Sequence, residues 1–186
     1  MPVRSANRSG QAYGFLAMTP IKPGEIEALQ QYLESLRERG PSPLSRVSRT
    51  HMARWVIVPK FHRKPAYRQR KDDMLEIPSL IFSSNLDGDL DSYLDELCEA
   101  LAPEAPEIWG RCIGCPPEAK GAALKEYLKF NQVDCGFFYA AYGQATVSKV
   151  RRTLEQRDQL VAFAVRSQGL SPEELQGAFV EEFAAS

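Results

Sequence analysis

The sequence predicts an α+β protein with a ferredoxin-like βαββαβ core, in which an antiparallel sheet carries both helices on one face. The first observation is the order of the segments, because strand-like and helix-like stretches follow one another in this order up to residue 113. The second is their pattern: some segments have apolar residues at helical spacing, and others are rich in β-branched and aromatic residues. The 186 residues are 44% hydrophobic and 25% charged, which is typical of one ordinary soluble domain.

The first half of this core is a strand, a helix and a second strand. Residues 12–18 are apolar and include aromatic side chains, which predicts a strand. Residues 25–39 have leucine and isoleucine at helical spacing and end at Gly40-Pro41, which predicts an amphipathic helix. Residues 49–58 are rich in β-branched and aromatic side chains and end at Pro59, which predicts the second strand.

The second half of the core has the same order. Residues 79–84 are predicted to form the third strand, and the following Asn85-Leu86-Asp87-Gly88 leads into a helix over residues 89–101 with one apolar stripe. Residues 107–113 are predicted to form the fourth strand.

A C-terminal β-α-α extension is predicted to follow the core. Residues 122–130 are helical in pattern, residues 136–142 carry aromatic residues at alternating positions, and residues 146–165 form a long amphipathic segment. Ser171-Pro172-Glu173-Glu174 is a capping box with proline at the first helical position, which predicts the start of a last helix. We therefore expect a flexible N-terminal tail over residues 1–11 and a single domain over residues 12–186, with an exposed basic loop at residues 60–73.

Charge is divided unevenly along the chain. The total of 23 Lys+Arg against 24 Asp+Glu is nearly neutral, but residues 1–71 hold 14 basic and 4 acidic side chains, and the remainder holds 9 and 20. The two halves are expected to pack against each other within one sheet or across subunits, which favours a homodimer over a dedicated nucleic-acid-binding protein. No apolar run approaches the roughly 18 residues of a membrane span, and no secretory signal is evident, so a cytoplasmic location is expected.

Several segments together resemble a known superfamily. Four segments carry the resemblance: Thr50-His51-Met52-Ala53-Arg54-Trp55, the run from Ile81 to Asp89, Ile108-Trp109-Gly110 and Phe138-Tyr139-Ala140-Ala141-Tyr142. Their order is similar to that in poorly characterised proteins of dimeric α/β-barrel type, some of them labelled peroxidase-like. The resemblance covers about residues 12–155. It implies a dimeric barrel, and distant kinship with antibiotic biosynthesis monooxygenases and dye-decolourising peroxidases raises an oxidative activity and a haem cofactor as expectations.

The match to the peroxidases themselves is incomplete. Their glycine-x-x-aspartate-glycine signature is reduced here to the closing Asp87-Gly88, and no histidine lies beyond His62, although a proximal histidine is expected in the later half of the chain. Both departures argue against a peroxidase of that type.

The candidate catalytic residues are His51 and Arg54, an ionisable pair within an apolar strand. His51 is expected to share a strand face with Trp55 and to act as a general base, a haem ligand or an anion clamp; a histidine satisfied by a backbone carbonyl is the alternative. A guanidinium in an apolar strand needs a partner, for which we expect Asp87, Asp89, Glu107 or a bound anion. The candidate ligand-binding residues are aromatic side chains on predicted strands, which form either a core or a pocket: Trp55, Phe82, Trp109 and Tyr139.

No metal site is predicted. Cys112 and Cys115 have the spacing of a ligand pair, but a zinc site needs two more ligands, which Cys98 or Cys135 would have to supply. We expect instead that the cysteines are free thiols, buried or half-buried at a strand end. The aspartates around Gly88 fit a calcium loop poorly because position 12 of the template is Leu94, and helix capping explains them.

Function is expected to be the binding of a small anionic or aromatic molecule, with an oxidative, monooxygenase- or peroxidase-like reaction as the activity implied by the resemblance. The alternative is a non-catalytic interaction module that docks on a protein or nucleic-acid partner through residues 39–71, which hold ten basic side chains and no acid. Nucleic acid is the less favoured partner, because the third predicted strand lacks the glycine-flanked aromatic pair of RNA-binding sheets.

Overall fold

The computed structural model describes residues 6–59 and 77–183. The chain divides into two compact units, Met1–Val147 and Ser148–Ser186. Among these described residues, the first unit contains the sheet and four α-helices, and the second contains a helical hairpin whose first helix begins at the boundary. The predicted basic loop at residues 60–73 lies outside the described residues.

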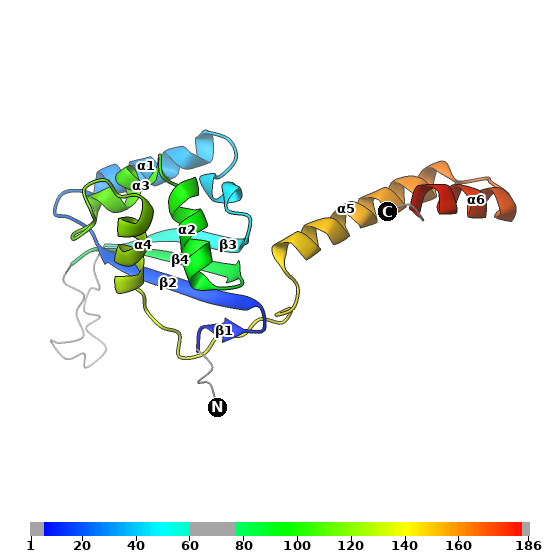
Figure 1. Cartoon of the computed structure of the whole chain (residues 1–186). Helices are drawn as coiled ribbons and strands as arrows, with labels where there is room; N and C mark the ends of the chain where they lie inside the picture. Colours follow the sequence, from blue (N-terminus) through cyan, green and yellow to red (C-terminus); the bar gives the residue numbers. More distant parts are fainter. Residues whose placement is uncertain (1–5, 60–76, 184–186) are drawn as a thin grey trace, which may run out of the picture. The chain divides into compact units, whose positions relative to one another are not determined.

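The first unit is built on a four-stranded antiparallel sheet (Figure 1). Its strands are β1 (Arg8–Ser9), β2 (Ala12–Pro20), β3 (Thr50–Val58) and β4 (Ser79–Asp87), in the order β1-β2-β4-β3. Both β2 and β3 pair antiparallel with β4, so β4 lies between two mutually parallel strands that are connected through helix α1 (Ile26–Glu38). This split β-α-β unit confirms the predicted α+β class and the antiparallel sheet.

The helices of the first unit cover one face of the sheet (Figure 1). They are α1, α2 (Leu90–Ala100), α3 (Ala105–Ile108) and α4 (Gly121–Phe130). Helix α2 begins where the Asp89 side chain accepts a hydrogen bond from the backbone N–H of Ser92 at 2.8 Å. Alternate side chains of β2 and β4 pack against the apolar stripes of these helices in one core, whose largest fully buried members include Phe15, Leu29, Phe82, Tyr93, Leu94, Ile108 and Trp109.

The predicted fourth strand is wrong. Residues 107–113 contain the end of α3 and the 3-10 helix η3 (Trp109–Arg111), which follow Pro106 in the first turn of α3. The buried residues of this segment are Ile108, Trp109 and Cys112, a helical spacing that the aromatic and β-branched content obscured. Instead of a fourth core strand, isolated bridges join Ala17 of β2 to Gln132 and join Ile21, which follows β2, to Cys112, so a ferredoxin-like fold is not confirmed.

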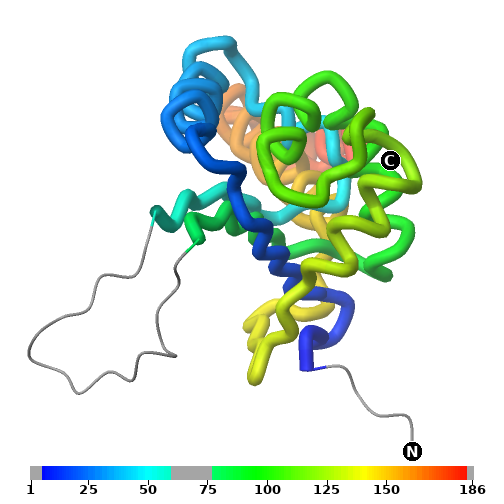
Figure 2. The backbone as a smooth tube through the Cα atoms, turned by 90° about the vertical axis from the view of Figure 1, so that its left-hand side faces the viewer, coloured from blue at the N-terminus to red at the C-terminus, as the bar shows by residue number. Residues whose placement is uncertain are grey.

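Residues 136–142 are also not a strand. This segment runs beside the N-terminal residues, as the yellow and dark blue parts of Figure 2 show. The backbone N–H of Gln11 donates to the carbonyl of Gly143 at 2.5 Å, and the N–H of Cys135 donates to Asn7 Oδ1 at 2.6 Å. Residues 7–11, which the sequence places in a flexible tail, therefore carry strand β1 and the buried side chain of Asn7.

The second unit is a hairpin of α5 (Val147–Arg166) and α6 (Pro172–Phe183). The predicted capping box is confirmed at the start of α6, where the backbone N–H of Ser171 donates to Glu174 Oε2 at 2.8 Å and the N–H of Glu174 donates to Ser171 Oγ at 3.4 Å. Within the described ranges, no helix combines the length and apolar character that crossing a membrane requires.

Candidate functional site

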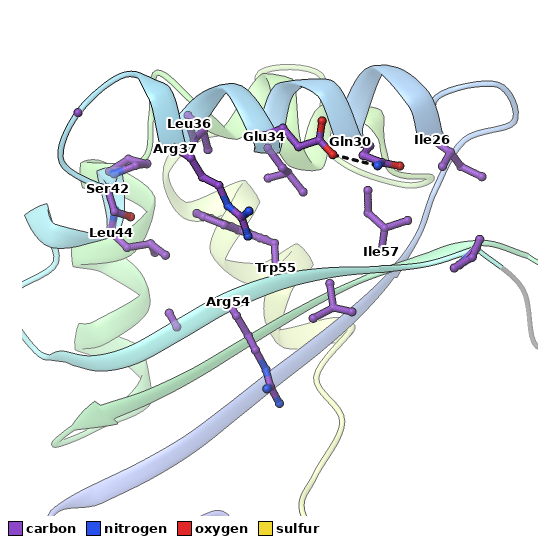
Figure 3. Close-up of a pocket in the computed structure, with 16 residues that line it drawn as sticks. Ile26, Gln30, Glu34, Leu36, Arg37, Ser42, Leu44, Arg54, Trp55 and Ile57 are labelled. Atoms are coloured by element: carbon purple, nitrogen blue, oxygen red, sulfur yellow. Dashed lines mark hydrogen bonds between the residues drawn. The ribbon is translucent and has the colours of Figure 1, made fainter.

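The candidate site is a groove in the first unit between α1 and β3 (Figure 3). It has a volume of about 680 Å³, within the range of roughly 300–1,000 Å³ that is typical of small-molecule sites. Most of its lining is apolar, and the polar side chains come mainly from α1 and from the loop that follows it. Because β3 is an edge strand, its outer margin borders the groove without a neighbouring strand among the described residues.

Helix α1 forms one wall of the groove. Ile26, Gln30, Leu33 and Arg37 follow one another at intervals of four, three and four residues, so they lie along one line of the helix. Gln30 Nε2 donates to Glu34 Oε1 at 3.0 Å. Figure 3 shows the Arg37 side chain extending from α1 toward Trp55, and no ion pair of Arg37 occurs among the described residues. The groove thus combines apolar walls with a guanidinium available to an anion.

Strand β3 forms the other wall through the face that carries Ala53, Trp55 and Ile57. The Trp55 ring lies 5.5 Å from the Phe82 ring and 6.2 Å from the Trp109 ring, measured between centroids. Its indole N–H is buried without an acceptor in the described part of the chain. A buried donor without a partner is unfavourable, so a ligand oxygen that reached this nitrogen would relieve a real cost.

The four aromatic candidates are brought together only in part. Trp55 lines the groove, whereas Phe82 and Trp109 are both 0% exposed and pack edge to face at 5.6 Å in the core behind it. Tyr139 lies in the loop after α4 and is 71% exposed, away from this cluster. Phe82 and Trp109 are therefore core residues, and Trp55 is part of the pocket wall.

The sequence predicts that His51 and Trp55 lie on the same face of the strand, and the structure differs. The pairing of β3 with β4 shifts between Thr50 and Met52, so His51 is the extra residue of a bulge that reverses the alternation. Its Nε2 lies 2.7 Å from Asp87 Oδ1, and the other carboxylate oxygen of Asp87 accepts the backbone N–H of Val147 at 2.6 Å. His51 is thus part of a partly buried polar link within the first unit, between β3, the end of β4 and the backbone of Val147.

Arg54 also differs from its prediction. Its side chain is exposed and, in Figure 3, points away from α1 on the opposite side of β3. The three acids expected to pair with it have other partners: Asp87 pairs with His51, Asp89 with Arg49, and Glu107 with Arg111. A guanidinium in water needs no carboxylate, which removes the premise of the prediction. His51 is therefore outside the groove lining, whereas Arg54 borders the groove beside Trp55 with its guanidinium directed to the other side of β3.

The described arginines between residues 39 and 59 are mostly engaged within the chain. Arg46 pairs with Glu104 at 2.5 Å, Arg49 lies 3.6 Å from Glu96 and 3.8 Å from Asp89, and Arg39 stacks on the Tyr32 ring at 5.2 Å. The basic first half and the acidic second half thus meet within one chain. The part of the basic segment beyond Pro59 lies outside the described residues.

The cysteines are free thiols, as predicted. Cys112 is buried and accepts a hydrogen bond from Thr19 Oγ1 at 3.3 Å. Burial raises the pKa of the Cys112 thiol, and burial together with the Cys112 charge raises the pKa of Cys115 to about 11, which opposes thiolate formation. In the described ranges, no three His, Cys, Asp or Glu side chains are placed to hold a metal ion.

Arg37 and the groove were missed by the sequence interpretation, which placed function on the strands. The signal that was present is the position of Gln30 and Arg37 beside the apolar stripe of α1, where a helix meets the margin of a sheet. Comparisons with family models, curated proteins and solved structures found no match to this chain. The family resemblance therefore stays a prediction.

Proposed function

We propose that the first unit binds a small anionic molecule with a flat or elongated apolar body in the groove between α1 and β3. The observation that supports this most is the Arg37 guanidinium, which forms no ion pair with any described residue and lies beside an apolar groove of about 680 Å³ that contains Trp55. The apolar body would lie between Leu33 and Ile57, and the anionic group would accept hydrogen bonds from Arg37.

Two other features of the groove support this ligand class. Among the described lining residues the acidic side chain is that of Glu34, which accepts a hydrogen bond from Gln30 and does not pair with Arg37, so an anion near Arg37 would not displace an ion pair between them. The Trp55 ring offers a flat surface, and its indole N–H, which has no acceptor among residues 6–59 and 77–183, offers a donor. A carboxylate or sulfonate on an aromatic ring meets both requirements.

The test uses 8-anilinonaphthalene-1-sulfonate, an anionic aromatic probe, titrated into the full chain and followed by its fluorescence. We expect Arg37→Gln to weaken probe binding about fivefold, which corresponds to roughly 1 kcal/mol for a charged hydrogen bond at a partly exposed site. Arg39→Gln is the matched control, because it removes the same charge from a residue that stacks on Tyr32 outside the groove lining. Equal affinity of the two variants would refute the proposal.

An oxidative reaction, haem and a dimeric barrel remain predictions from the resemblance, and docking through residues 39–71 remains the alternative. The absorption spectrum of the purified protein tests the haem prediction, since a Soret band would support it. Binding that weakens steeply between low and moderate salt would favour docking, whereas salt-insensitive binding of a small molecule would favour the groove.

A further inference from the structure

The second unit is held together by an aromatic contact between its two helices. The Phe163 ring of α5 lies 5.8 Å from the Phe179 ring and 5.5 Å from the Phe183 ring of α6, and both contacts are edge to face. Phe163 is buried. One face of α5 is therefore covered by α6.

The opposite face of α5 carries a second apolar stripe. Val150, Leu154, Val161 and Val165 are separated by four, seven and four residues, and at about 100° per residue they fall within a sector of roughly 60° centred opposite Phe163. These side chains are 42%, 45%, 56% and 64% exposed. An amphipathic helix with two apolar faces is typical of a helix that packs against a second partner.

We propose that this stripe is covered by the same stripe of a second copy of the chain, with the two α5 helices antiparallel about a two-fold axis near residues 155 and 156. This register sets Val150 opposite Val161 of the partner subunit, and the reciprocal contact follows by symmetry. Leu154 then packs on the aliphatic part of Arg157 of the partner subunit. Val165 extends the apolar contact by one turn at each end.

Charge on the margins of the stripe supports the antiparallel direction. Arg151 and Asp158 lie two turns apart on one margin, and Arg151 has no ion pair among the described residues. Asp158 accepts two hydrogen bonds from the neighbouring Arg157, both at Oδ1, so its Oδ2 can accept from a second arginine. Like margins meet when helices run antiparallel, so Arg151 lies beside Asp158 of the partner subunit, and two such pairs form. The other margin carries Thr153, Arg157 and Ala164 and holds no acid, so parallel pairing would give Arg151 no carboxylate.

Sedimentation equilibrium of the full chain over a range of concentrations tests the proposal. We expect a dimer, and we expect Val161→Glu to raise the dimer dissociation constant at least about tenfold, because it places a charge in the apolar contact. Leu160→Glu is the matched control: its side chain is 49% exposed but lies outside the stripe, so the dimer should persist. The far-ultraviolet circular dichroism of each variant confirms that the helices remain.

Charge exchange tests the register. Arg151→Glu and Asp158→Arg should each weaken the dimer, and the double variant should recover it, because each exchanged pair is complementary again across the antiparallel axis. A monomeric wild-type chain at all concentrations up to its solubility limit would overturn the proposal. A dimer that is equally sensitive to Val161→Glu and Leu160→Glu, or unaffected by both, would overturn it as well.

Discussion

Asp87 is expected to be a main polar link of the first unit, and its replacement provides a quantitative test. Its carboxylate, at 12% side-chain exposure, accepts the backbone N–H of Val147 at 2.6 Å and lies 2.7 Å from His51 Nε2. A hydrogen bond to a charged group contributes about 1.5–3 kcal/mol, and Asp87→Ala removes two while leaving the Val147 N–H without its acceptor. We expect Asp87→Ala to lower the free energy of unfolding by about 3 kcal/mol.

Urea unfolding followed by tryptophan fluorescence measures this loss, because Trp55 and Trp109 both report on the first unit. Asp91→Ala is a suitable control, since Asp91 is an exposed carboxylate that also bonds to a side chain, Lys129. Its removal should leave stability close to that of the wild type.

A double-mutant cycle assigns the His51 contribution. His51→Ala alone should cost about 1 kcal/mol, and the double variant with Asp87→Ala should cost less than the sum of the two single changes, because both remove the same contact. An Asp87→Ala variant within about 0.5 kcal/mol of the wild type, or fully additive single changes, would refute the structural role of this link.

Two further predictions follow from close contacts and from burial. Gly14→Ala should destabilise the first unit by about 1–3 kcal/mol, because the new Cβ would lie 2.8 Å from the Phe138 ring. Gly136→Ala is the control and should be tolerated, because no atom lies within 4 Å of its Cβ. Equal shifts of the melting temperature for the two variants would contradict this prediction. Burial raises the pKa of the Cys98 thiol from 9.0 to about 12, so stability should fall as the pH rises from about 9, where the unfolded thiol loses its proton and the folded one does not. Cys98→Ala should lose part of this alkaline dependence in urea titrations at pH 8 and pH 10, and an unchanged dependence would argue against the buried thiol as its source.

Periodicity predicted the parts of the fold that depend on local pattern. Helix α1, strand β3 and the capping box of α6 lie within a residue or two of their expected bounds, because an apolar stripe, a β-rich run and a cap each act over a few neighbouring residues. The prediction of a strand over residues 107–113 was wrong because an aromatic and β-branched run also suits a buried helical turn. The choice between strand and helical turn depends on tertiary contacts, such as those of Trp109 with Trp55 and Phe82.

The candidate site was less predictable, for two physical reasons. A bulge at His51 changes which face of β3 each side chain occupies, and one extra residue is enough to separate His51 from Trp55. The groove depends on how α1 lies against the margin of β3, so Arg37 and Trp55 meet only through tertiary packing. Trp55 was identified from its ring alone, and Arg37 had no local signal beyond its place beside the apolar stripe.

The two tryptophans allow the most direct test of the proposed binding site. The chain contains two indole N–H groups, Trp55 at the groove and Trp109 in the core, and their signals in a ¹H–¹⁵N correlation spectrum can be assigned with Trp55→Phe. On titration with 1-naphthoate, an aromatic carboxylate, we predict a large shift of the Trp55 indole signal and a much smaller one for Trp109, with both effects weakened by Arg37→Gln. Naphthoate binding that leaves the Trp55 indole signal in place, or shifts that are confined to residues near His51 and Asp87, would contradict the proposed site.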